Sequence, residues 1–161
     1  MDVFSPEIDA VELPRLNFPE YNFTTQPAVA GRSGVRIFDK IRLKYVALTP
    51  EEWVRQHFLQ LLTQGHFYPK TAIAIEKSIQ VGSLLKRFDI LVFDPEQKPW
   101  MMIECKAETV ALDGLVLEQL LHYNLSVPVR YLLLTNGPQC VGWERQEQGL
   151  VAVEKIPSYP V

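Results

Sequence analysis

The segment that decides the fold is R-F-D-I-L-V-F-D-P-E-Q-K-P-W-M-M-I-E-C-K, residues 87–106. Two apolar, strand-like runs flank a polar turn, so the segment is predicted to form a β-hairpin. Asp89 interrupts the first run, and Glu104 and Lys106 end the second. Because burying an unpaired carboxylate is costly, Asp89 requires a partner, and a metal ion can serve two carboxylates at once.

The alternation of side chains along a strand predicts how these groups are arranged. Glu104 and Lys106 are two residues apart and share a face, whereas Cys105 points to the other. Antiparallel pairing would bring Asp89 to the same face, opposite Glu104. Two carboxylates and one ammonium would then converge, and oxygen ligands of this kind suit Mg²⁺ or Mn²⁺ rather than zinc.

The spacing of these residues and of the motifs around them resembles a known family. Asp89 followed by Glu104-Cys105-Lys106 is similar to the metal-binding core of the PD-(D/E)XK nuclease superfamily, with Phe88 where the superfamily name has proline. Four motifs together resemble the N-terminal domain of type I restriction enzyme R proteins: Leu84-Leu85-Lys86-Arg87-Phe88-Asp89-Ile90, Ile103-Glu104-Cys105-Lys106, Gln119 to Asn124, and Thr135-Asn136-Gly137. The resemblance spans roughly residues 35–143.

The resemblance implies a metal-dependent endonuclease that hydrolyses DNA phosphodiester bonds with Mg²⁺, or Mn²⁺. Asp89 and Glu104 would bind the ion, with Glu52 and the main-chain carbonyl of Cys105 as further ligands. The ion would activate a water for in-line attack, while Lys106 would position that water or stabilise the transition state. Two carboxylates this close repel each other, so at least one is expected to have a raised pKa without metal.

Three further candidate residues lie on predicted helices. Thr49-Pro50-Glu51-Glu52 is typical of a helix start, and Glu52 is either the second half of a capping box with Thr49 or a metal ligand. Gln119 and Tyr123 are four residues apart and share a helical face. They match the Q-x-x-x-Y element that borders the active site in the resembled family; the alternative is that they are ordinary polar positions of an amphipathic helix.

The pattern of elements predicts an α/β (α+β) fold. A hairpin over 35–48 precedes a restriction-endonuclease-like core, whose central mixed β-sheet is flanked by helices. The core has the order helix, three strands, helix, two strands, at residues 50–64, 72–81, the two halves of 87–106, 112–125, 130–134 and 139–143, with a further edge strand at 151–153. Residues 1–34, rich in proline, are expected to form an extended arm ordered by Phe18, Tyr21 and Phe23, and residues 35–161 a single nuclease domain.

Composition limits the class of protein. The chain has 161 residues, 47% hydrophobic and 22% charged, as in soluble globular proteins. No apolar run approaches the ~20 residues of a membrane span, and the N-terminus lacks the features of a secretory signal. Cys105 and Cys140 lie in strand-like runs and are expected to be buried, reduced thiols, which favours a cytoplasmic location. Although the net charge is −3, basic residues are concentrated between positions 32 and 87. They form either a phosphate-binding face or scattered surface charge.

The expected partners are DNA and, because no G-x-x-x-x-G-K-[ST] phosphate loop occurs, a separate motor or specificity subunit. A homodimer is possible and a membrane is not expected. Two alternatives stay open. One is a catalytically silent nucleic-acid-binding or assembly module with the same fold. The other is an interaction domain in which Asp89, Glu104 and Lys106 form a buried structural ion pair, with no cavity beside them.

Overall fold

The computed structural model describes residues 16, 18–127 and 129–161. Within them the strands form two sheets. The smaller sheet has three antiparallel strands: β1 (Thr25–Pro27), β2 (Val35–Asp39) and β3 (Lys44–Ala47). The larger sheet has six strands in sequential order: β4 (Ile73–Val81), β5 (Leu84–Phe93), β6 (Pro99–Cys105), β7 (Tyr131–Thr135), β8 (Cys140–Gln146) and β9 (Gly149–Ala152).

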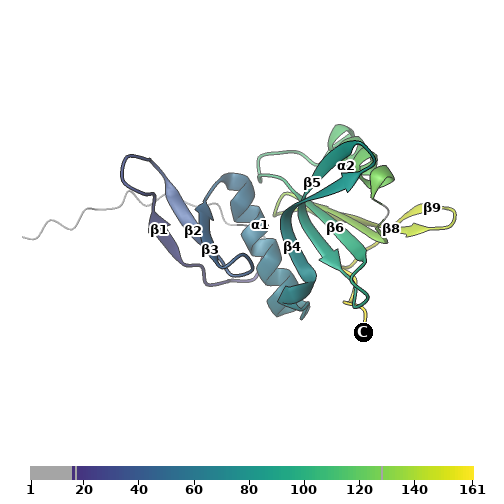
Figure 1. The fold of residues 1–161 in the computed structure, drawn as a ribbon, viewed down its shortest axis with the longest axis horizontal. Coiled ribbons are helices and arrows are strands. Elements are labelled where there is room, and N and C mark those ends of the chain that lie inside the picture. Colours follow the sequence, from purple (N-terminus) through teal and green to yellow (C-terminus); the bar gives the residue numbers. More distant parts are fainter. Residues whose placement is uncertain (1–15, 17, 128) are drawn as a thin grey trace, which may run out of the picture.

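The larger sheet is mixed, as predicted. β6 and β7 are parallel, and the other neighbouring strands are antiparallel. A parallel pair requires a crossover connection, and the helix α2 (Gly114–Ser126) lies in it. The first helix, α1 (Pro50–Gln60), continues into a π-helical turn over Leu61–Gly65 and lies between the two sheets (Figure 1). The α/β fold class is therefore confirmed.

Helix starts agree with the predicted capping residues. The Thr49 hydroxyl accepts a hydrogen bond from the Glu52 N–H at 3.0 Å, and Pro50 occupies the first helical position. The Asp113 carboxylate likewise accepts from the N–H groups of Leu115 and Val116 at the start of α2. Both helices thus begin where a side-chain oxygen satisfies main-chain donors that have no partner inside the helix.

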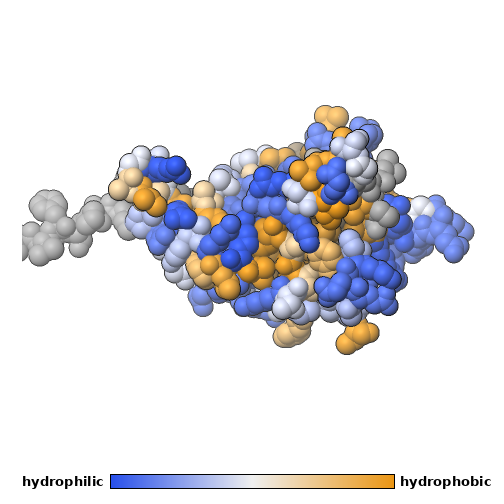
Figure 2. All heavy atoms as spheres, viewed as in Figure 1, coloured by the Kyte–Doolittle hydropathy of each residue, from blue (hydrophilic) through white to orange (hydrophobic). Residues whose placement is uncertain are grey.

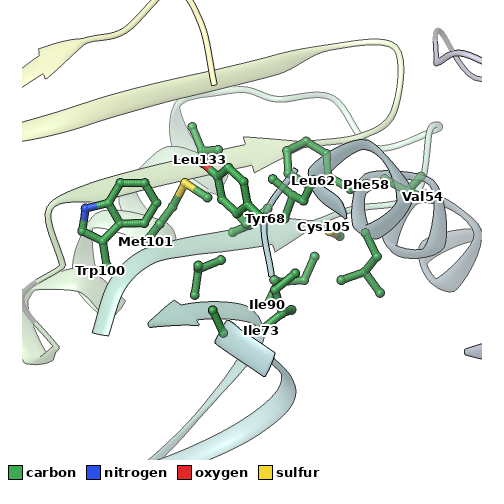
Figure 3. Packing of buried hydrophobic residues seen from close by; sticks show 14 residues of the cluster. Val54, Phe58, Leu62, Tyr68, Ile73, Ile90, Trp100, Met101, Cys105 and Leu133 are labelled. Atoms are coloured by element: carbon green, nitrogen blue, oxygen red, sulfur yellow. The ribbon is translucent and has the colours of Figure 1, made fainter. Parts of the chain in front are cut away.

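The six-stranded sheet separates two hydrophobic clusters. On one face Val54 and Phe58 of α1 and Leu62 of the π-helical turn pack against alternate residues of the strands, such as Ile90 (Figure 3). Ile103 belongs to the same cluster. On the other face Leu120 of α2 packs with residues of the opposite parity, such as Leu91, Met102, Leu132 and Leu134. Since both faces are covered, the central strands β6 and β7 are apolar along most of their length.

The alternation breaks at Asp89. Phe88 belongs to the cluster beneath α2, but Ile90, two residues later, belongs to the cluster beneath α1. Opposite this break, between the pairs Ile75–Ile90 and Lys77–Phe88, Glu76 has a φ of +50°. A left-handed conformation at a non-glycine residue costs about 1–2 kcal/mol, so surrounding contacts must hold Glu76 in place.

Several expectations from the sequence need correction. β1 lies within residues 1–34, where no strand was predicted, and pairs with β2. Cys105 is buried, as expected, but Cys140 is exposed at the start of β8. Residues 1–15 and 17 of the expected arm lie outside the described residues, so the domain boundary stays a prediction. None of the helices in the described part of the chain is long and apolar enough to cross a membrane.

The face seen in Figure 2 carries both hydrophilic and hydrophobic side chains, with hydrophobic ones in the region of β5 and α2 and near the middle of the molecule. Leu84, Leu85 and Leu115 are exposed there. Such residues are ordinary on protein surfaces when they are scattered. They identify no partner by themselves.

An aromatic cluster around His57 fastens the segment before β1 to α1. The rings of Phe18, Tyr21 and Phe23 lie 5.5, 6.4 and 4.7 Å from the imidazole, and Trp53 lies 4.2 Å from it. The Nδ1–H of His57 donates to the Trp53 carbonyl at 2.8 Å, because a carbonyl can only accept. Burial lowers the His57 pKa below its ordinary 6.5, which this hydrogen bond offsets in part.

This cluster predicts a loss of stability in acid. Below pH 6.5 the unfolded chain binds a proton at His57 before the folded chain does, so the free energy of unfolding falls as pH decreases toward the lower folded pKa. The loss is at most about 1.4 kcal/mol per pH unit. In urea denaturation between pH 7 and 5, His57→Gln should flatten this decline, whereas the exposed-site control His122→Gln should follow the wild type. Parallel curves for His57→Gln and wild type would contradict the assignment.

Candidate active site

The β5–β6 hairpin brings Asp89 close to the end of β6. The strands pair antiparallel, with Ile90 opposite Ile103, as the sequence predicted. Beyond that pair, the Cys105 N–H donates to Oδ2 of Asp89 at 2.8 Å. The Cys105 thiol is fully buried, so it is the main chain of Cys105 that meets Asp89.

Glu104 and Lys106 lie beside a small pocket beneath α2. The Lys106 ammonium is 3.2 Å from Oε1 of Glu104, and both side chains are about a quarter exposed. The pocket, about 120 Å³ in volume, is lined by Glu104, Lys106 and the α2 residues Val116, Gln119 and Leu120. A cavity next to the charges is what a buried structural ion pair would lack, so this observation argues against that alternative.

The electrostatics of the pocket favour an added cation. Burial and, second, the charge of Asp89 raise the pKa of Glu104 to about 7, although Lys106 acts in the opposite direction. The pKa of Lys106 is raised because Glu104 outweighs the effect of burial. The expected raised pKa is therefore confirmed, and its main cause is desolvation, with repulsion between the carboxylates second.

Asp89 also contacts α1. Nη2 of Arg55 lies 3.2 Å from Oδ1 of Asp89 and 3.3 Å from Oε1 of Glu51. Burial and, second, the charge of Asp89 raise the pKa of Glu51. The charge of Glu51 in turn contributes to the raised pKa values of Glu104 and Lys106. Of the two acidic residues, Glu51 is therefore the one whose charge is coupled to Glu104 and Lys106, whereas the role predicted for Glu52 stays a prediction.

Glu52 has a different environment. Its carboxylate accepts hydrogen bonds from Arg42 at 2.8 Å, Arg55 at 2.5 Å and Gln56 at 2.8 Å, and the residue is buried. The predicted capping box forms only through the Glu52 N–H, because the side chain turns to the arginines. Adjacent helical positions point about 100° apart, so the Glu52 carboxylate turns to Arg42 and Gln56 while Glu51 contacts Arg55 from the side that interacts electrostatically with Asp89.

Glu76 joins the same charged group from β4. Its carboxylate lies 2.9 Å from Arg42, 3.4 Å from Arg55 and 2.6 Å from Arg87. These charge-assisted contacts offset the strained backbone of Glu76. Nothing in the sequence of β4 indicates that three arginines converge on Glu76.

The Thr135-Asn136-Gly137 turn fixes the segment that follows Lys106. The Lys106 N–H donates to the Thr135 carbonyl at 2.8 Å, and the Asn136 amide donates to the Val110 carbonyl at 3.0 Å. The Gly137 N–H donates to the Thr135 hydroxyl, and Gly137 has a φ of +99°, which favours glycine. The motif thus positions the chain between the catalytic candidates and α2.

The two predicted residues of α2 have different outcomes. Gln119 lines the pocket together with Glu104 and Lys106. The backbone of Tyr123 belongs to α2, but its side chain lies outside what the structure describes, so its role stays a prediction.

The donor set suits a divalent ion held by few protein ligands. In the described part of the chain, no three His, Cys, Asp or Glu side chains are grouped closely enough to hold a metal. Glu104 lines the pocket, and Asp89 lies near enough for its charge to add to the effect of burial in raising the pKa of Glu104. Two carboxylates with water in the remaining positions are a usual arrangement for Mg²⁺.

Comparison with known proteins gives one family match and one fold match. A family model described as the type I restriction enzyme R protein N terminus matches residues 50–157. Among solved structures, a fragment described as an HsdR subunit of a type I restriction enzyme from Vibrio vulnificus YJ016 has a TM-score of 0.51 at 18% sequence identity. The match covers 69% of this chain and 24% of that one, so the chain spans about a quarter of its length. No curated protein matches the chain.

The coupling of the two carboxylates can be measured by NMR of the carboxyl carbons in metal-free protein. Glu104 should titrate near pH 7, and Asp89→Asn should lower its pKa because a neighbouring negative charge is removed. Burial should still keep the value above the usual 4.5. Glu96→Gln, in the exposed turn at the other end of the hairpin, is the control and should change nothing. A wild-type Glu104 that titrates near 4.5 would contradict the site geometry.

Proposed function

This chain belongs to the family of type I restriction enzyme R protein N termini, and on that premise we propose that it is a metal-dependent endonuclease that hydrolyses DNA phosphodiester bonds. The observation that carries the proposal is the pocket lined by Glu104 and Lys106, where the nearby charge of Asp89 helps to raise the pKa of Glu104 to about 7. The resemblance of the sequence to the PD-(D/E)XK nuclease superfamily supports the same assignment.

Each residue is proposed to have one task. Asp89 and Glu104 would hold a Mg²⁺ or Mn²⁺ ion, with the Cys105 carbonyl as a further ligand. The chemistry supplied by such an ion is activation of water and neutralisation of charge at the scissile phosphate. Lys106 holds a proton on its ammonium and would stabilise the phosphate charge that develops during attack. Gln119, on the opposite wall of the pocket, would orient the phosphate or Lys106.

Glu51 takes the place of Glu52 as the proposed third acidic group. Nη2 of Arg55 contacts both Glu51 and Asp89. The Glu52 carboxylate instead accepts hydrogen bonds from two arginines and Gln56. Glu52 is then a structural residue that holds Arg42 and Arg55 in place.

The proposed partners follow from family membership. The family is named for a protein of type I restriction enzymes, so DNA is the proposed substrate. The 161 residues contain no G-x-x-x-x-G-K-[ST] phosphate loop, so the proposed nuclease would depend on a motor or specificity function that lies outside these residues.

One observation favours a second candidate, a DNA-binding or assembly module without turnover. Arg55 already contacts Asp89, and no third ligand side chain is grouped with the two carboxylates among the described residues. Such a module would bind DNA without cleaving it, so the same cleavage assay separates the two functions.

Cleavage of supercoiled plasmid tests the nuclease proposal. With Mg²⁺ or Mn²⁺ the wild type should nick the plasmid, and Asp89→Ala, Glu104→Ala and Lys106→Ala should each lower the rate about 100-fold or more, because each removes a group that acts on the transition state. Lys98→Ala is the matched control, since Lys98 also pairs with a glutamate, Glu96, but in the exposed hairpin turn. Activity that survives in Asp89→Ala and Lys106→Ala would remove the assignment.

The roles of Glu51 and Glu52 can be separated by comparing stability with activity. Glu51→Gln should weaken Mn²⁺ binding and cleavage while leaving urea denaturation near wild type, since its side chain is 43% exposed. Glu52→Gln should lower the free energy of unfolding by about 3 kcal/mol, because it leaves buried arginines short of a counter-charge. If Glu52→Gln instead keeps its stability and loses Mn²⁺ binding, Glu52 is the ligand after all.

A further inference from the structure

Arg55 occupies the position between the acidic residues of the proposed site. The residue is 3% exposed, and its guanidinium contacts four carboxylates, from Glu51, Glu52, Glu76 and Asp89. Its Nε has no hydrogen-bond partner among the described residues. A buried donor without an acceptor is costly. The contacts of Nη1 and Nη2 with the carboxylates therefore determine the orientation of the guanidinium and offset the cost at Nε.

The contacts of Arg55 are unequal. Nη1 lies 2.5 Å from Glu52, a short charge-assisted contact that anchors the side chain. Nη2 lies 3.2 and 3.3 Å from Asp89 and Glu51, the two groups on the side of the site. A cation that draws Asp89 and Glu51 toward the pocket can therefore separate them from Nη2 while Glu52 still holds the guanidinium.

We propose that Arg55 is a positioning residue that acts as a built-in counter-ion: it holds Asp89 and Glu51 when no metal is bound, and its fixed charge weakens divalent-cation binding by the free protein. This inference rests on the proposed function. The charge remains beside the ion, so repulsion opposes binding. The phosphate of bound DNA would offset that repulsion, which would make metal loading favour the DNA complex.

Removal of the charge tests the inference with Mn²⁺ alone as the probe. Arg55→Gln in the full chain, titrated with Mn²⁺ by calorimetry in the absence of DNA, should bind about tenfold or more tightly than wild type. The variant is expected to fold, because Glu52 keeps Arg42 and Gln56, and Glu76 keeps Arg42 and Arg87. Circular dichroism and urea denaturation check this.

Arg42→Gln is the matched control. Arg42 contacts Asp39, Glu52 and Glu76, so it is a member of the same charged group, but no contact joins it to Asp89 or Glu51 among the described residues. Its Mn²⁺ dissociation constant should stay within about twofold of wild type. If buried arginines had a purely structural role, the Mn²⁺ dissociation constants of Arg55→Gln and Arg42→Gln would change by similar factors.

Arg55→Lys separates the effect of charge from that of hydrogen-bond geometry. It also tests the inference if Arg55→Gln does not fold. Lysine keeps the charge but lacks the planar fork, so its Mn²⁺ affinity should stay within about twofold of wild type. Unchanged or weaker binding in folded Arg55→Gln, or a tenfold change in Arg55→Lys, would overturn the inference. Failure of the nuclease proposal is distinct, since wild type would then neither bind Mn²⁺ nor cut DNA.

Discussion

The structure depends on the burial of several carboxylates around two arginines where α1 crosses the start of the hairpin. Asp39, Glu52, Glu76 and Asp89 reach this region from four different elements, and Arg42 and Arg55 connect them. Uncompensated charges could not be buried here, so the arginines fix the relative positions of the small sheet, α1 and β4–β5. The hydrophobic clusters supply most of the favourable burial, whereas this charged group determines which side chains face the pocket.

The proposed site lies where regular strand geometry fails. Asp89 and Glu76 face each other at an interruption of side-chain alternation, and Glu76 adopts a left-handed backbone. The interruption turns Asp89 toward α1 and the Cys105 N–H, while Glu104 keeps the parity of Met102 and faces α2. Asp89 therefore contacts α1 and the main chain at the end of β6, while Glu104 lines the pocket beside α2, and the two carboxylates influence each other electrostatically.

Sequence patterns predicted the elements better than the contacts between them. The hairpin, both helices and the succession of elements along the chain follow from apolar periodicity and from helix-start signals such as Thr49. Glu51 could not be predicted as a residue of the site, because the position of its carboxylate depends on the rotation of α1 about its axis and on arginines distant in sequence. β1 was missed since Pro27 and the surrounding polar residues show no alternation. Arg55 had no sequence signal, as its partners lie on α1, β4 and β5.

The position of Arg42 bears on where this folding unit begins. The family match starts at residue 50, yet Arg42 lies in the turn between β2 and β3 and reaches both Glu52 and Glu76. A fragment cut to residues 50–157 would retain every proposed catalytic group but leave those two acids with fewer cations. The part of the chain that matches the family is thus short of positive counter-charges without the small sheet, whose turn is a structural part of the domain rather than an appendage.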